Sequence, residues 1–377
     1  MTTTLLEGAL LLSVCLVAFA NGSNDNFKGV ATLYGSGTVS YRSALVWATI
    51  TTLVGSIAAV AFSAKLVAAF GGKGLVPDAL AHDPRFILAA GFGAGATVLI
   101  ASFVGLPIST THSLVGALVG AGLLATNGHV EFSRLGRLFL LPLALSPILA
   151  MAATAVFYPI VRFTRRRAGI ETRMCVCIKG SMEPVSLASD GARVLRSTGI
   201  ALTVGEQEAC REQYWGTLLG VDAQALLDRL HFLSSGLVGL ARGLNDAPKI
   251  VALLVAARLL RVDVGLSVVA VVMAIGGLLG ARRVAETLSH RIAEMNQGQA
   301  FTANAVTAVL VLIASGSGLP VSTTHVSVGS IAGIGAATGR GRSATIATIT
   351  VAWITTLPLA GLMGAIIYAV VRRGTSV

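Results

Sequence analysis

The sequence has few charged residues for its length. Only 12% of its 377 residues are Asp, Glu, Lys or Arg, whereas 54% are hydrophobic. A soluble domain has about 25% charged residues, so this chain has too few to cover a water-facing surface. The sequence therefore predicts an integral membrane protein whose solvent is a lipid bilayer. Its 43 glycines fit this prediction, because glycine allows close packing of membrane helices.

Cysteine and catalytic patterns are scarce as well. No His or second Cys pair gives zinc spacing near the four cysteines, so we expect reduced thiols at Cys15, Cys175, Cys177 and Cys210. No metal site or cofactor is predicted with certainty. No nucleophile–base pair indicates an enzyme, and no GxxxxGKS or GxxxxGKT motif indicates ATP-driven transport.

The net charge of +11 does not indicate nucleic-acid binding. The basic residues lie in short loops between apolar runs, which is typical of membrane proteins, and they lack aromatic residues interleaved among them. No Lys or Arg precedes the first apolar run, and no cleavage pattern follows it. We expect that run to be a retained membrane helix and not a cleaved signal.

A polar stretch at 164–228 divides the hydrophobic segments five and five. A membrane helix needs about 20 apolar residues, and the candidate runs are 4–21, 41–70, 84–104, 107–126, 138–161, 230–256, 262–281, 299–315, 319–338 and 344–371. Runs longer than a single span predict tilted or broken helices. Within the polar stretch we expect a small accessory segment with a helix from Asp222 to Leu230.

The polar stretch begins with a group of arginines, which predicts a cytoplasmic location: Arg162, Arg165, Arg166, Arg167 and Arg173. Five crossings on each side then give the halves opposite orientations, although Arg372 and Arg373 argue mildly against this. We predict an all-α integral membrane fold of two inverted repeats with broken or re-entrant helices and about 10–12 transmembrane segments. The expected parts are membrane repeat 1 (1–163), the loop segment (164–228) and membrane repeat 2 (229–377).

Two motifs occur once in each half. The first reads GxNDxxK and starts at Gly22 and Gly243, an offset of 221 residues (243 − 22). The second reads GLPxSTTH and starts at Gly105 and Gly318, an offset of 213 (318 − 105), with Ile against Val as its one difference. Chance recurrence of such a string is negligible, so the sequence indicates an internal duplication.

The GLPxSTTH motif lies between apolar runs with almost no spacer, so the chain must turn at membrane depth, where irregular backbone has to be buried or line a cavity. Gly105 suits the unusual dihedral angles, Pro107 ends one helix, and Ser109 or Thr110 can cap the next. A helix N-terminus and hydroxyl groups there suit an anion such as phosphate. A break that serves packing alone, with the hydroxyls bonded to the preceding turn, is the alternative.

The GxNDxxK motif places two Asp–Lys pairs inside apolar runs, where charge is costly and usually functional. Asp25 and Asp246 could hold a cation, accept a coupling proton, or accept a hydrogen bond from a protonated oxyanion. Lys28 and Lys249 could neutralise these carboxylates or bind the anion directly as substrate-binding residues. Phosphate still carries a proton at neutral pH and sulfate does not, so the carboxylates favour phosphate. A local ion pair that only holds a helix break is the alternative.

The remaining polar residues in apolar surroundings allow two interpretations. His112 and His325, which end the second motif, could carry a proton or could pack structurally. Glu286 and His290 with Arg282 and Arg283 suggest an interfacial cluster that sets orientation. Glu286 could also reach the cavity of the motifs, together with Gln299, Thr302 and Asn304.

The four motif copies, in this order, resemble those of the inorganic phosphate transporter (PiT) family, in particular low-affinity phosphate permeases of bacteria. The resemblance covers both halves and implies an inverted-repeat homodimer in the bacterial cytoplasmic (inner) membrane that imports phosphate by symport with a cation. It also implies a site for phosphate and coupling cations at Asn24, Asp25, Ser109, Thr110, Thr111, Asn245, Asp246, Ser322, Thr323 and Thr324.

The sequence differs from the sodium-coupled members of that family at one position in each repeat. Their pattern is close to GANDVANA, with Asn where Lys28 and Lys249 stand. Because an ammonium group would compete with sodium, we hypothesise that the lysines replace sodium ions and that protons drive transport. Sodium coupling through the same Asn and Asp residues, a sulfate permease of the same family and a passive anion channel are the alternatives.

Overall fold

The structure is a computed structural model that describes residues 3–72, 75–173, 177–187, 193–203, 213–218, 220–293 and 295–374. The chain forms two compact units. The first consists of Met1–Val161 together with Asp228–Val377, and the second of Arg162–Leu227. Both motif pairs lie in the first unit, whose described regular elements are helices joined by turns.

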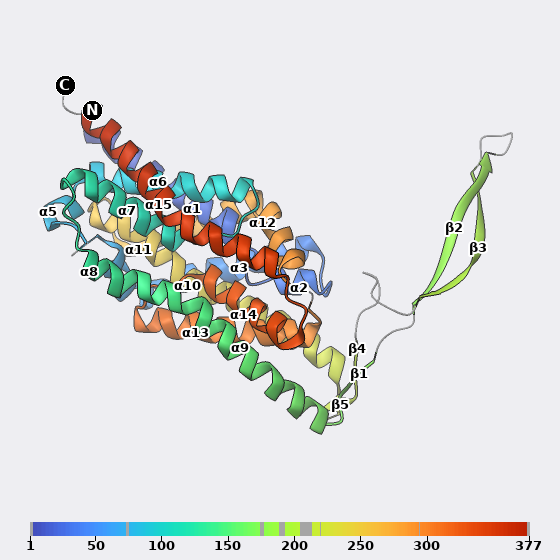
Figure 1. Ribbon diagram of the computed structural model, residues 1–377. Helices are drawn as coiled ribbons and strands as arrows, with labels where there is room; N and C mark the ends of the chain where they lie inside the picture. The colour runs from blue at the N-terminus through green and yellow to red at the C-terminus, as the bar shows by residue number, and fades with distance from the viewer. Residues whose placement is uncertain are drawn as a thin grey trace. The chain divides into compact units, whose positions relative to one another are not determined.

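Fifteen α-helices are described, and two of them, α9 and α10, continue into the second unit (Figure 1). Their bounds are α1 (Thr3–Asp25), α2 (Ala31–Gly35), α3 (Tyr41–Ala58), α4 (Ala64–Phe70), α5 (Asp78–Ala81), α6 (Pro84–Phe103), α7 (Thr110–Ala125), α8 (Phe132–Leu135), α9 (Leu141–Arg167), α10 (Ala223–Ala256), α11 (Val262–Gly280), α12 (Arg282–Glu286), α13 (Gln297–Ser317), α14 (Thr323–Thr338) and α15 (Ser343–Gly374).

Each of the ten predicted apolar runs overlaps one of the ten longest helices that the structure describes. The run at 41–70 is broken, as its length suggested, because a short 3-10 turn at Ala59–Ala61 separates α3 from α4. The two halves also keep the spacing of the motifs. Helix α11 begins 221 residues after α3 (262 − 41), and α14 begins 213 residues after α7 (323 − 110).

Within the described residues, seven helical segments are long and apolar enough to cross a membrane, so the protein is a multi-pass membrane protein. This number is smaller than the predicted 10–12, partly because α7 and α14 have only 16 residues each. Sixteen residues rise about 24 Å, less than the roughly 30 Å of a hydrocarbon core. Helix α10 is also not among the seven segments, and its apolar sequence includes buried charged side chains.

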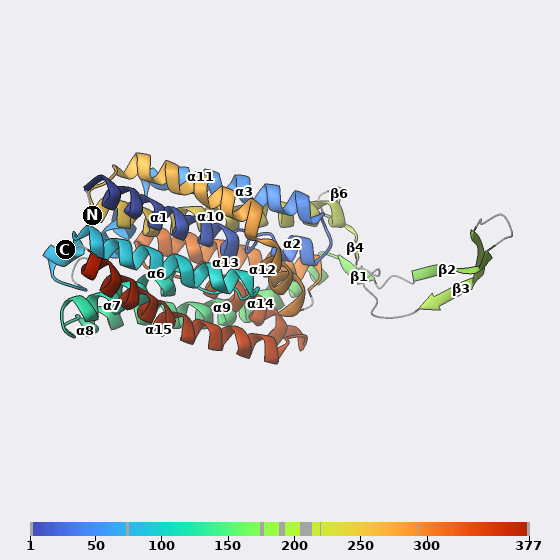
Figure 2. The same ribbon diagram turned by 90° about the horizontal axis from the view of Figure 1, so that it is seen from above.

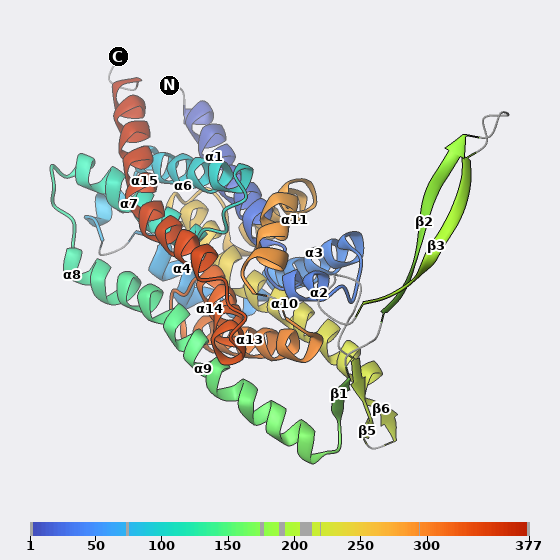
Figure 3. The same cartoon turned by 45° about the vertical axis from the view of Figure 1, so that its right-hand side comes forward.

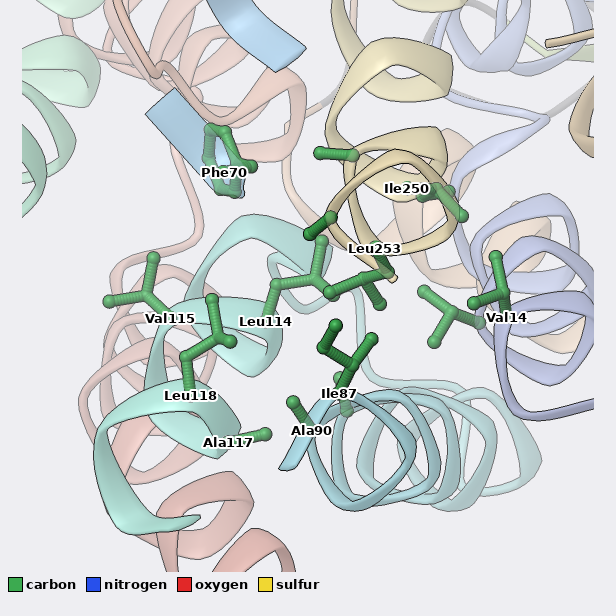
Figure 4. Close-up of a cluster of buried hydrophobic side chains, with 14 of the residues drawn as sticks. Val14, Phe70, Ile87, Ala90, Leu114, Val115, Ala117, Leu118, Ile250 and Leu253 are labelled. Carbon is green, nitrogen blue, oxygen red and sulfur yellow. The ribbon is translucent and has the colours of Figure 1, made fainter. Parts of the chain in front are cut away.

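The helices of the first unit pack in a connected series. Helix α1 lies against α6 and α11, and α15 lies against α6 and α7 (Figure 2). Apolar side chains from α1, α6, α7 and α10 meet in a core that includes Val14, Ile87, Leu114 and Ile250 (Figure 4). This core holds the ends of the motif-bearing helices α7 and α10 in place.

The second unit contains three antiparallel strand pairs, of which β2–β3 is the longest (Figure 3). The strands are β1 (Glu171–Arg173) with β4 (Gln213–Trp215), β2 (Cys177–Leu187) with β3 (Arg193–Thr203), and β5 (Thr217–Leu218) with β6 (Val221–Asp222). The helix expected at Asp222–Leu230 is not separate, because it forms the first turns of α10. Cys175 and Cys210 lie outside the described residues.

Candidate functional site

Each GLPxSTTH motif forms a tight turn between two helices. Gly105 and Gly318 both have a φ of +73°, in the left-handed region that glycine adopts without steric cost. Four residues after each glycine, a serine caps the next helix: Ser109 accepts a hydrogen bond from the His112 N–H at 3.2 Å. Ser322 accepts the equivalent bond from His325 at 3.3 Å. The helix break expected from the sequence is therefore present in both copies.

The motif asparagines hold these turns. Asn24 donates to the Leu106 carbonyl at 3.0 Å and accepts from the Ile108 N–H at 3.1 Å. Asn245 donates to the Val321 carbonyl at 3.2 Å. Val321 occupies the position of Ile108 in the other repeat (321 − 108 = 213). Each asparagine thus fixes the position of the turn in its own half.

The two carboxylates lie beside the first residues of the capped helices. Thr110, the first residue of α7, donates to Asp25 Oδ2 at 3.3 Å, and Thr323, the first residue of α14, donates to Asp246 Oδ2 at 3.3 Å. Asn21 approaches both carboxylates with one amide nitrogen, 2.9 Å from Asp25 Oδ2 and 3.4 Å from Asp246 Oδ2. Both GxNDxxK copies and both STTH copies therefore meet in one cluster.

The lysines connect the two halves. Lys28 forms an ion pair with Asp25 in its own motif and donates to Thr324 of the second half. Lys249 lies 3.3 Å from Asp246 Oδ1 and donates to Thr111 of the first half at 3.0 Å. The local ion pair that the sequence allowed is present, but each lysine also contacts the hydroxyl of the opposite STTH motif.

Sequence reasoning missed a third cation in this cluster, Arg242. Its Nε lies 3.7 Å from Asp246 Oδ2, and one of its terminal nitrogens donates to Asn21 Oδ1 at 2.7 Å. Asn21 and Arg242 each stand one residue before the glycine of a GxNDxxK copy. An arginine within the apolar run 230–256 was the available signal.

The cluster is closed to solvent. Asn24, Asn245 and Thr324 are 0% exposed, and no site residue expected from the sequence is more than 5% exposed. Buried charges are costly unless they are paired and hydrogen-bonded, and here every carboxylate has a cationic neighbour. The arrangement is that of an occluded polar site surrounded by apolar packing.

The two motif histidines lie next to each other. The ring centres of His112 and His325 are 4.7 Å apart, and His325 packs on Trp353 at 4.0 Å. His325 Nδ1 is 2.9 Å from the Leu143 carbonyl. One buried nitrogen in each ring, His112 Nδ1 and His325 Nε2, has no hydrogen-bond partner. The contact between the rings brings the ends of the two STTH motifs together.

The expectation that Glu286 and its polar neighbours reach the same cavity is wrong for Glu286, Gln299 and Thr302. The Glu286 side chain is 53% exposed and pairs with Arg282 at 3.7 Å. Gln299 caps α13 in a capping box with Asn296, and Thr302 bonds to the backbone of its own helix. Asn304 alone approaches the first motif, where it donates to the Gly29 carbonyl at 3.2 Å.

The described residues include no group of three or more His, Cys, Asp or Glu side chains that could hold a metal ion. Oxygen ligands for a small cation are present at Asp25 and Asp246, which the sequence also named as coupling-ion residues. Lys28 and Lys249 already lie against these carboxylates.

A multi-pass helical membrane protein, with buried charges where two interrupted helices meet, is the class that the fold and site define. Residues 21–364 match the Phosphate transporter family, so the chain belongs to this family of transporters, which are not enzymes. A similar Pyrococcus horikoshii protein, provisionally named a phosphate permease, is 28% identical over 94% of this chain and 95% of its own.

Two further similarities cover nearly the whole chain. A Mycobacterium tuberculosis protein named a probable low-affinity inorganic phosphate transporter is 29% identical over 96% of this chain and 78% of its own length. A solved structure titled the sodium-dependent phosphate transporter has a TM-score of 0.75 at 20% identity, covering 98% of this chain and 99% of that one. At this identity the structural likeness establishes the fold alone.

Proposed function

We propose that this chain is a secondary active transporter that imports inorganic phosphate across a membrane. The proposal depends chiefly on one observation: each motif lysine contacts the STTH hydroxyl of the opposite half, Lys28 with Thr324 and Lys249 with Thr111. A site assembled in this way contains cations, hydroxyl groups and two helix N-termini, all of which suit an oxyanion. The names of the relatives from Pyrococcus and Mycobacterium point to the same substrate.

The proposed substrate site consists of twelve residues from the two motif pairs. The threonines and lysines would contact the phosphate, and the carboxylates would accept hydrogen bonds from its remaining proton. The asparagines would keep the turns in place beside it. These residues are Asn24, Asp25, Lys28, Ser109, Thr110, Thr111, Asn245, Asp246, Lys249, Ser322, Thr323 and Thr324.

We infer that protons and not sodium drive uptake. The Lys28 ammonium pairs with Asp25, and the Lys249 ammonium lies 3.3 Å from Asp246. A sodium ion would need these same carboxylate oxygens and would be repelled by the ammonium groups. The proposed coupling residues are therefore Asp25 and Asp246, with Asn24 and Asn245 beside them.

The proposed topology is an inverted repeat in which the halves have opposite orientations in the membrane. The matched spacing of α3 with α11 and of α7 with α14 supports a repeat. The boundaries at 163 and 229, the cytoplasmic side for 164–228, 10–12 segments in all, a homodimer and a bacterial cytoplasmic membrane remain part of this proposal.

Phosphate uptake into proteoliposomes tests the proposal. Radiolabelled phosphate is supplied with and without a pH gradient, with and without sodium, and with sulfate or arsenate as competitors. We expect concentrative uptake that requires the pH gradient, is inhibited by arsenate more than by sulfate, and is indifferent to sodium. Uptake that never exceeds equilibrium would indicate a channel, and stronger inhibition by sulfate would indicate a sulfate permease. Strict sodium dependence would refute proton coupling.

A further inference from the structure

Arg242 breaks the symmetry of an otherwise symmetric site. It follows Asn21 by 221 residues (242 − 21), the offset of the GxNDxxK repeat, so the two side chains occupy equivalent positions. They also contact each other, because an Arg242 terminal nitrogen donates to Asn21 Oδ1 at 2.7 Å and to the Asn21 carbonyl at 3.2 Å. One repeat therefore provides a neutral amide where the other provides a permanent positive charge.

The terminal nitrogens of Arg242 are occupied by the protein itself. One bonds to Asn21 as described, and the other donates to Asn26 Oδ1 and to Thr52 Oγ1, both at 3.1 Å. A guanidinium has five N–H groups, and four of them are used in these bonds. The fifth, on Nε, has no hydrogen-bond partner and faces Asp246 Oδ2 at 3.7 Å. Arg242 is 1% exposed, and its one unbonded N–H faces Asp246, so it contributes mainly its charge to the site.

The charges in the cluster do not cancel. With the histidines neutral, Asp25 and Asp246 oppose Lys28, Lys249 and Arg242, which leaves one positive charge (3 − 2 = 1) in a buried site. The other side chains that contact the guanidinium, Asn21, Asn26 and Thr52, carry no charge. An unbalanced buried charge is unfavourable. An arriving anion would neutralise this cluster, whereas a cluster without Arg242 would become negative and would need a mobile cation.

We propose that Arg242 is a built-in cation that replaces one transported cation, so that the arriving anion balances the charge of the site without that ion. Arg242 is a positioning residue, because it acts through Asn21 and Asp246 and does not touch the substrate. This inference deepens the proposed function and depends on it for the identity of the anion.

Three variants test this role. Arg242→Gln removes the charge and keeps an amide that can bond to Asn21, whereas Arg242→Lys keeps the charge. Asn26→Asp provides an independent approach, because it leaves Arg242 in place. It replaces the amide that accepts a hydrogen bond from Arg242 with a carboxylate of the same shape, which opposes the arginine charge. Asn26 is outside the proposed substrate site, so this variant also answers the question if Arg242→Gln does not fold.

Two measurements are made on each variant. The first is phosphate uptake by proteoliposomes in sodium, lithium or choline medium at one pH. The second is the melting temperature in detergent with and without sodium, because a bound ion stabilises the folded state. We expect Arg242→Gln and Asn26→Asp to gain uptake on the order of tenfold or more on adding sodium, together with a higher melting temperature. In wild type and Arg242→Lys, uptake should change less than about twofold on adding sodium. A change of that size can arise from weak interactions of the ion with surface charges.

The contrary results are distinct. Sodium-independent uptake in both Arg242→Gln and Asn26→Asp, with no shift in melting temperature, would overturn the inference. So would two folded variants that are inactive in every cation and show no sodium-dependent melting. A wild-type protein that transports neither phosphate nor arsenate would overturn the proposed function instead, while the sodium dependence of the melting temperatures would still decide whether Arg242 occupies a cation's place.

Discussion

Each buried charge in this protein interacts with a residue that is distant in the sequence. Lys28 reaches Thr324, Lys249 reaches Thr111, and Arg242 reaches Asn21. Such contacts offset the cost of removing charges from water only while all partners remain in place. Substitutions that remove one partner should therefore lower stability as well as transport, so uptake is compared between variants that remain folded.

Asp25→Asn should abolish concentrative phosphate uptake. The variant keeps the shape of the side chain but removes the charge that pairs with Lys28 and the acceptor that the anion would use. The control is Asp263→Asn. This substitution makes the same chemical change in the exposed ion pair of Asp263 with Arg261. Near-normal uptake by Asp25→Asn in proteoliposomes would assign this carboxylate a structural role only.

Thr324→Val should reduce the initial rate of phosphate uptake roughly tenfold. This factor corresponds to the free energy that a hydrogen bond to a charged group contributes. Thr324 accepts from Lys28 and donates to the Ile108 carbonyl at 2.7 Å, and valine can do neither. Thr350→Val is the matched control, because Thr350 is exposed on α15 and bonds only within its own helix. Equal uptake rates in the two variants would argue against a contribution of Thr324 to the site.

At the scale of helices, the site is positioned by the two helix pairs that the GLPxSTTH turns separate, α6–α7 and α13–α14. The apolar runs, the Gly–Pro pair and the capping serine were all readable in the sequence, because they depend on local backbone chemistry. The contacts between lysine and threonine were not readable, because they join residues 296 and 138 positions apart. The contact of Arg242 with Asn21 was not readable for the same reason, since the two residues lie 221 positions apart.

Gly105→Ala should lower the melting temperature by several degrees. Alanine in the left-handed region costs about 1–2 kcal/mol, and its Cβ would lie 3.2 Å from the Arg283 carbonyl oxygen. Gly316→Ala is the control, because Gly316 lies in α13 with open space around it and without a positive φ. Thermal unfolding in detergent measures both, and a melting temperature of Gly105→Ala at or above that of the control would contradict this account.

At the scale of the whole membrane unit, each half packs its GxNDxxK helix against a helix of the other half. Gly22 of α1 packs against the backbone of α11 near Gly277, and Gly243 of α10 packs against the backbone of α3 near Ser56. Each GxNDxxK helix therefore packs against a helix of the other half. The glycine of this motif allows the two helices to approach closely. No local pattern in the sequence predicted this role for the glycine.

Gly243→Ala should destabilise the whole unit. The new Cβ would lie 2.5 Å from the Ser56 nitrogen, so α10 and α3 would have to separate, at a cost of about 1–3 kcal/mol for overpacking. Gly8→Ala in α1 has open space and serves as the control. Melting temperature and the monodisperse fraction in size-exclusion chromatography report the outcome. Unchanged values for Gly243→Ala would mean that this helix contact is not tight.

The pairing of Arg242 with Asn21 bears on how such a protein could have evolved. A single ancestral repeat could build the crossed lysine–threonine contacts only as an antiparallel pair of identical chains. In that pair the same side chain would occupy both equivalent positions, and two arginines would repel each other across the symmetry axis. The Arg–Asn contact of 2.7 Å thus requires two positions that mutate independently. Gene duplication provides that independence, so the asymmetric Arg–Asn pair dates from after the duplication.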